Sequence, residues 1–246
     1  PPDLPVVEYR DETVMPGLVA ASTDLAGFHR GDEAVAGAYR AVDAFDRYGD
    51  FRTILAGGVT TAYVDPGRHR LVTGVGAVVR LGGSADSRVL REEGELAVNF
   101  VESVYGPPRD VEYIFPASSD VAIEPAKRQR PDSRLGQLPG LREALESALN
   151  PASGAKFNYA MTTLGQRLRA NVPIRLRADR AVDLAQAVDF LRSRKGGILI
   201  STGEVNTIAG PLAEAKLPLV YEVSLPTRRP SGNLGVNPEV FEQDIQ

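Results

Sequence analysis

The sequence predicts an α/β fold built around a parallel sheet. In the last third of the chain, short apolar runs alternate with amphipathic stretches at the spacing of βα repeats. Nearer the N-terminus, glycine-bounded apolar runs predict further strands. The chain has 246 residues, of which 43% are hydrophobic, and this is enough for one sizeable core.

The first half of the chain carries strand signals separated by turns. Pro and Gly pairs punctuate these runs, and Asp65-Pro66-Gly67 is a turn that ends a strand. The stretch 107–133 is rich in Pro, Arg and Asp, which predicts a surface excursion. In order, we predict short strands within 5–20, a helix within 31–48, a strand at 59–64, one strand within 71–83, and either a helix or a strand at 95–106.

The second half alternates helix and strand more clearly. Leu141, Ala144, Leu145 and Leu149 recur at helical spacing and form one apolar face. Small residues at 150–156 interrupt the helical pattern there. We predict helices at 135–149, 157–169, 181–194 and 204–215, the last interrupted at Gly210-Pro211, and strands at 172–176, 197–200 and 217–223.

Charge and hydropathy exclude several classes of partner. The net charge of −4 argues against a nucleic-acid partner or an anionic lipid surface. No apolar run approaches the roughly 20 residues that a membrane helix needs. We therefore expect a soluble chain, and the composition leaves both a cytoplasmic and an exported location open.

Scarce histidine and absent cysteine limit the chemistry that this chain can perform. There is no Cys, which removes disulfides, thiolate metal sites and Cys nucleophiles together. The two histidines, His29 and His69, stand apart among loop-like residues. Histidine is the commonest zinc ligand and the usual general base near neutral pH.

Three segments carry recognisable motifs. The first is Val14-Met15-Pro16-Gly17-Leu18-Val19. The second is Gly57-Gly58-Val59-Thr60-Thr61, which a GxGAVV run at 74–79 extends. The third is PIRLRADRAVDL, which ends at Leu184 and is followed by ILISTGE and by LAEAKLP. Together these segments resemble the amidohydrolase superfamily, in particular its imidazolonepropionase-like branch, whose VxPGxID and GVTT strands are similar to the first two.

The resemblance implies a (β/α)8 TIM-type barrel, complete or incomplete, with a small β-sandwich element at the N-terminus. We expect residues 1–17 to contribute the sandwich strands and residues 18–246 to form the barrel. These residues are expected to reach only about the seventh strand of the barrel. The family's active site lies at the C-terminal ends of the barrel strands. There a divalent metal activates water for hydrolysis of C–N bonds in amides or cyclic ureides.

This chain departs from the family at each metal-binding histidine position within view. Ser22 and Asp24 stand where the family has HxH after the first strand. Arg177 and Asp179 stand where a later strand supplies a motif like RIHAH, and the next strand ends in Ser201 and Thr202. We therefore predict a degenerate site with no catalytic residue, no metal and no cofactor.

Arg177 is the most informative of these replacements. A guanidinium always carries its charge, and it would stand where a cation should bind. Our hypothesis is that Arg177 replaces the metal electrostatically and pairs with Asp24 or a neighbouring carboxylate. Three further carboxylates are expected near strand ends, as part of a pocket or as oxygen ligands for Mg²⁺, Ca²⁺ or Mn²⁺. They are Asp65, Glu204 and Glu222.

Simpler structural roles compete with each functional interpretation. Asp24 is also suited to a turn or a helix cap, and Asp65 to its Asp-Pro-Gly turn. Arg177 is also suited to a salt bridge at the barrel rim. Asp179 and Glu204 are suited to the first turns of helices, where the helix dipole favours negative charge.

The function predicted from these observations is a non-catalytic amidohydrolase-like protein that acts as a structural or assembly subunit. An unclosed barrel exposes strand edges, so a protein partner or a homo-oligomer is expected. One alternative is a metal-dependent hydrolase of non-peptide C–N bonds with an unusual carboxylate site. Another is a small-molecule binding protein that keeps the pocket without the chemistry.

Overall fold

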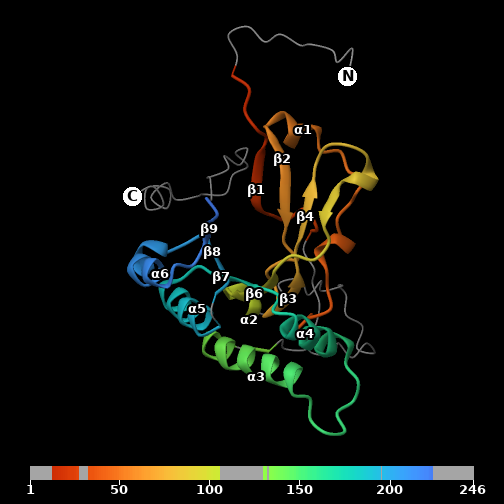
Figure 1. Cartoon of the computed structure of the whole chain (residues 1–246). Coiled ribbons are helices and arrows are strands. Elements are labelled where there is room, and N and C mark those ends of the chain that lie inside the picture. Colours follow the sequence, from red (N-terminus) through yellow and green to blue (C-terminus); the bar gives the residue numbers. More distant parts are fainter. Residues whose placement is uncertain (1–12, 28–32, 106–129, 132, 195, 224–246) are drawn as a thin grey trace, which may run out of the picture.

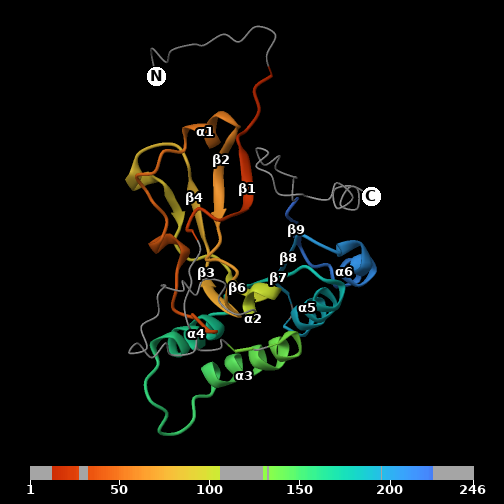
Figure 2. The same cartoon turned by 180° about the vertical axis from the view of Figure 1, so that it is seen from behind.

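A computed structural model describes residues 13–27, 33–105, 130–131, 133–194 and 196–223 of the chain. Within these ranges the chain forms two β-sheets and six α-helices in a mixed α/β arrangement (Figure 1, and from behind in Figure 2). No helix of the described residues is long and apolar enough to span a membrane.

The larger sheet has five strands in the order β3-β6-β7-β8-β9. Strands β6 to β9 are mutually parallel and lie side by side in chain order, as βα repetition requires, whereas β3 is antiparallel to β6. This confirms the predicted parallel sheet. The strands are β3 (Val72–Val75), β6 (Leu96–Phe100), β7 (Ile174–Ala178), β8 (Ile198–Ser201) and β9 (Leu219–Tyr221).

Helices contribute apolar side chains to a shared core with the larger sheet. Leu141 of α3, Leu164 of α4 and Leu184 of α5 are fully buried against strand residues such as Leu176. The helical spacing of these apolar positions is why these stretches form helices with one buried stripe. The helices are α3 (Gln137–Leu149), α4 (Tyr159–Arg169), α5 (Ala181–Ser193) and α6 (Ala209–Ala215), with two short ones, α1 (Arg52–Ala56) and α2 (Glu102–Tyr105).

The smaller sheet has four strands in the order β1-β2-β4-β5. Strand β1 is parallel to β2, whereas β4 is antiparallel to both of its neighbours. A second apolar core packs on this sheet and includes Phe45, Phe51, Val64 and Val79. The strands are β1 (Leu18–Thr23), β2 (Val59–Val64), β4 (Ala77–Arg80) and β5 (Val89–Arg91).

Strand β7 has one apolar face and one cationic face. Ile174, Leu176 and Ala178 belong to the core shared with the helices. Successive side chains of a strand point to opposite faces, so Arg175 and Arg177 point away from the helices. Both arginines approach Asp65, which directly follows β2 of the smaller sheet. This second face of β7 therefore positions the site described below.

Two predicted elements were wrong. The single strand expected within 71–83 is two strands in different sheets, β3 and β4. Gly74 has φ +105°, and a Cβ there would overlap the Tyr39 carbonyl oxygen. The helix expected within 31–48 is, in the described part, only a 3₁₀ turn at Ala41–Asp43. There Val35 and Arg40 form bridges to β3, so backbone pairing replaces a helix.

The remaining expectations concern closure of the barrel, the N-terminal sandwich element and the stretches 95–106 and 107–133. The described residues do not form a closed eight-stranded barrel, because their strands lie in two separate sheets and β2 pairs with antiparallel β4 rather than with a second parallel strand. Residues 13–17 contain no strand, and residues 1–12 lie outside the described residues, so the N-terminal sandwich element stays a prediction. Most of the excursion at 107–133 also lies outside them. The stretch 95–106 contains both β6 and α2.

The contact between α3 and α4 depends on a glycine. A Cβ on Gly165 of α4 would overlap the carbonyl oxygen of Ala148 in α3, which is backbone and cannot move aside cheaply. We expect Gly165→Ala to lower the free energy of unfolding by about 1–3 kcal/mol, measured by urea denaturation.

Gly140→Ala in α3 is the matched control, because the nearest atom to a Cβ there is Leu71 Cδ2 at an ordinary 3.6 Å. Alanine favours a helix over glycine, so this variant should gain up to about 1 kcal/mol. Equal effects of the two substitutions would contradict the assigned helix contact.

Candidate functional site

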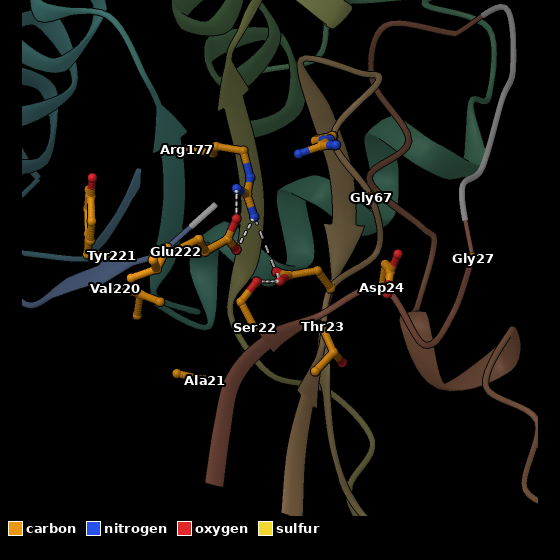
Figure 3. A pocket seen from close by; sticks show the side chains of 13 residues that line it. Ala21, Ser22, Thr23, Asp24, Gly27, Gly67, Arg177, Val220, Tyr221 and Glu222 are labelled. Atoms are coloured by element: carbon orange, nitrogen blue, oxygen red, sulfur yellow. Dashed lines mark hydrogen bonds and ion pairs between the residues drawn. The ribbon is translucent and has the colours of Figure 1, made fainter. Parts of the chain in front are cut away.

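A cavity of about 450 Å³ lies where the two sheets meet. Its walls come from the C-terminal ends of β1 and β2 in the smaller sheet and of β7 and β9 in the larger one (Figure 3). Ligand sites of α/β proteins commonly occupy this end of parallel strands. The lining residues are Ala21, Ser22, Thr23, Asp24, Gly27, Asp65, Gly67, Arg68, Arg177, Val220, Tyr221, Glu222 and Val223.

The ends of β1 and β2 are tied together beside the cavity. The Asp65 amide donates to the Thr23 carbonyl oxygen at 2.9 Å. The Thr23 hydroxyl donates to the Tyr63 carbonyl oxygen at 2.7 Å. These two bonds hold Ser22 and Asp65 near each other, and the Ser22 hydroxyl donates to Asp65 Oδ2.

Arg177 pairs with the carboxylates of Glu222 and Asp65. Its Nη1 and Nη2 donate to the two carboxylate oxygens of Glu222 at 2.5 and 2.7 Å, and Nη2 lies 3.9 Å from Asp65 Oδ2 (Figure 3). The Arg177 side chain is 8% exposed. Burial alone would lower the pKa of Arg177, but the hydrogen bonds and charge of Glu222 and the charge of Asp65 outweigh it and raise that pKa.

Burial and nearby charges together shift the pKa values of Asp65 and Glu222 in opposite directions. Burial raises the pKa of Asp65, which is 12% exposed, although Arg175, the Ser22 hydroxyl and Arg177 counteract it. For the more exposed Glu222, burial would also raise the pKa, but the hydrogen bonds and charge of Arg177 leave that pKa below its ordinary value. Glu222 therefore stays ionised in its pair with Arg177.

Arg175 joins the two sheets, and the sequence interpretation missed it. Its Nε lies 3.3 Å from Asp65 Oδ1, and its guanidinium carbon lies 4.1 Å from the centre of the Tyr63 ring. Nη2 also donates to the Ala21 carbonyl oxygen. The signal was the alternation of Arg175 with Arg177, which places both on one face of a strand.

Some of the predicted site residues meet at this cavity. Ser22, Asp65, Arg177 and Glu222 form one connected network, so Arg177 pairs with neighbouring carboxylates. Asp24 also lines the cavity but is exposed, and among the described residues it makes no ion pair with Arg177 (Figure 3). Its carbonyl oxygen accepts a hydrogen bond from the Gly27 amide, which is turn geometry.

The remaining predicted residues form a separate cluster that does not line the cavity. Asp179 Oδ1 accepts from the Thr202 amide at 2.8 Å, and the Ser201 hydroxyl accepts from the Gly203 amide at 3.1 Å. Glu204 Oε2 accepts from the Ala181 amide at the start of α5, at 2.8 Å. These contacts fit the simpler interpretation, in which polar side chains satisfy amides around a helix start.

The donor set at the cavity does not fit a divalent metal. Among the described residues, no group of three or more His, Asp or Glu side chains is placed to hold an ion. The two carboxylates nearest to forming such a group, Asp65 and Glu222, are already paired with the Arg177 guanidinium, which would repel a cation. No hydrolytic step through a metal can be built on these residues.

Comparison with known proteins gives a fold relationship. No protein-family model matches the chain. No curated protein sequence matches it. The structure is similar to the crystal structure of an amidohydrolase from Thermotoga maritima MSB8, with a TM-score of 0.65 and 21% sequence identity. The match covers 91% of this chain but 63% of the other, so this chain spans less than two thirds of its neighbour's length. The chain therefore has an amidohydrolase-like fold.

Proposed function

We propose that this chain is a non-catalytic amidohydrolase-like protein that acts as a subunit of a larger assembly. The observation that carries this proposal is the pairing of Arg177 with Glu222 and Asp65. The guanidinium neutralises the carboxylates that could otherwise attract a metal ion, and it cannot lose its charge near neutral pH. The chain thus keeps the fold and a pocket, and its own Arg177 is paired with the anionic groups of that pocket.

Two of the four end strands of the described sheets support the assembly role. β1 and β9 are each an end strand of its sheet among the described residues. Leu18 and Val19 of β1 are exposed, as are Leu219 and Tyr221 of β9. An unpaired strand edge with exposed apolar side chains is a ready template for another polypeptide.

Metal analysis combined with an activity assay tests the non-catalytic role. We expect the purified chain to hold less than stoichiometric metal, and to leave simple amides and cyclic ureides unhydrolysed with or without added Zn²⁺ or Mn²⁺. A stoichiometric metal whose removal by a chelator abolishes hydrolysis would overturn the proposal. It would favour the alternative, a metal-dependent hydrolase of non-peptide C–N bonds.

Light scattering after size-exclusion chromatography tests the assembly role separately. We expect an oligomer, or co-purification with a stoichiometric partner. A clean monomer that remains soluble at high concentration would count against the subunit role, but not against the absence of catalysis.

The second candidate function is small-molecule binding. The cavity volume of about 450 Å³ falls within the range of ordinary ligand pockets. Its wall combines apolar Val220 and Val223 with the charged groups of Arg68 and Asp24.

A further inference from the structure

The Arg177–Glu222 pair has the geometry of a carboxylate-binding site with an internal occupant. Two roughly parallel N–H···O bonds of 2.5 and 2.7 Å join the guanidinium fork to both oxygens of Glu222. This bidentate arrangement recognises a planar carboxylate as such, whichever molecule carries it. A carboxylate on a ligand would make the same two bonds.

The two carboxylates around Arg177 differ in how firmly they are held. Asp65 follows the central strand β2 and is bound by Ser22 and Arg175 as well as by Arg177. Glu222 directly follows β9, a three-residue end strand, and its side chain is 25% exposed, about twice the value for Asp65. Glu222 is therefore the group that an incoming anion would displace.

The cavity beside this pair suits a small organic acid. Arg68 lines it and is exposed, and its charge acts on Glu222, so a second cation faces the same region. Val220, Tyr221 and Val223 form a largely apolar stretch of wall where a carbon skeleton could pack. Displaced Glu222 would reach solvent, because its side chain is 25% exposed, more than that of Asp65 or Arg177.

We propose that this cavity binds a small carboxylate, which exchanges with Glu222 for the Arg177 guanidinium while Arg68 provides the second positive charge. The proposal deepens the small-molecule role given above and rests on the pocket being a binding site. Glu222 then acts as a built-in competitor that keeps Arg177 paired when no ligand is present.

Isothermal titration with benzoate and benzamide tests the proposal. The two probes have nearly the same shape and differ in the carboxylate that the Arg177 fork would recognise. We expect the wild-type chain to bind benzoate at least about tenfold more tightly than benzamide. Equal binding of the two probes, or no binding of benzoate at millimolar concentration, would overturn the proposal.

Three substitutions locate the binding. Glu222→Gln removes the competing charge and should tighten benzoate binding about tenfold, whereas Glu214→Gln on exposed α6 should leave it unchanged. Arg177→Lys keeps the charge but loses the fork, and should weaken benzoate binding about tenfold or more. If Arg177→Lys does not fold, Arg68→Met should still weaken binding severalfold. Tighter binding in the Glu214 variant alone, or unchanged binding in both the Glu222 and the arginine variants, would also overturn it.

The benzoate experiment and the metal analysis test different proposals, so either one can fail without the other. Failure to bind benzoate in a chain that also lacks metal would remove the ligand proposal alone. A stoichiometric metal at the cavity would remove the non-catalytic role, whatever benzoate does.

Discussion

Arg175→Met is expected to lower the free energy of unfolding by about 3–5 kcal/mol, because it leaves a buried carboxylate without its nearest cation. Arg175 is 4% exposed, and its Nε lies 3.3 Å from Asp65. The same side chain stacks on the Tyr63 ring and donates to the Ala21 carbonyl oxygen. Methionine fills similar space but replaces none of these contacts between the two sheets. Urea denaturation followed by circular dichroism measures the change.

Two further variants separate the buried charge from general loss of packing. Arg194→Met removes an exposed arginine whose guanidinium carbon lies 6.0 Å from the centre of the Phe190 ring, and should change stability by no more than about 0.5 kcal/mol. Combining Arg175→Met with Asp65→Asn removes the stranded charge and should recover part of the loss. A cost below about 1 kcal/mol for Arg175→Met would show that the two sheets do not depend on this arginine.

Arg177→Met is expected to convert the site from one that excludes cations to one that binds them. The change leaves Asp65 and Glu222 facing each other without the guanidinium between them. Two close carboxylates repel, so we expect a loss of about 2–4 kcal/mol in the absence of metal. Carboxylate oxygens suit Ca²⁺ and Mn²⁺, so millimolar concentrations of either ion should restore part of that stability.

The response to added metal should differ between the Arg177→Met variant and the wild type. Added Ca²⁺ or Mn²⁺ should raise the unfolding temperature of the Arg177→Met variant and leave that of the wild type unchanged. Arg180→Met is a matched control, because Arg180 is exposed and pairs only loosely with Glu102 at 3.5 Å. It should cost no more than about 1 kcal/mol and show no response to metal. Metal-dependent stabilisation of the wild type would contradict the role that we assign to Arg177.

The predictions that succeeded rest on local patterns. The stretch 59–64 has the β-branched residues and flanking glycines of a strand, and β2 has those bounds. The helical spacing within the predicted ranges 135–149 and 181–194 specifies α3 and α5, because each helix needs only one apolar stripe. The strands predicted at 172–176 and 197–200 are present as β7 and β8, with β7 displaced by two residues and β8 by one.

The predictions that failed depend on contacts between distant segments. Nothing local distinguishes one strand in 71–83 from two, because the break occurs where Gly74 passes the Tyr39 backbone. Residues 33–48 carry helix-forming alanines, yet Val35 and Arg40 pair with β3. Tertiary pairing there overrides local propensity.

The sequence by itself determined the alternation of strands and helices, the absence of thiol ligands, and the presence of a permanent cation, Arg177, at the end of a predicted strand. Only the tertiary structure decided that Glu222 and Asp65, rather than Asp24, hold that cation. It also decided that Asp179, Ser201 and Glu204 accept hydrogen bonds from backbone amides around the start of α5, that of Thr202 among them. The physical reason is that strand alternation sets the face on which a side chain lies, whereas its partner depends on how two separate sheets pack together. Arg175 illustrates the difference, since its partners Tyr63 and Asp65 lie more than a hundred residues away in the chain and in the other sheet.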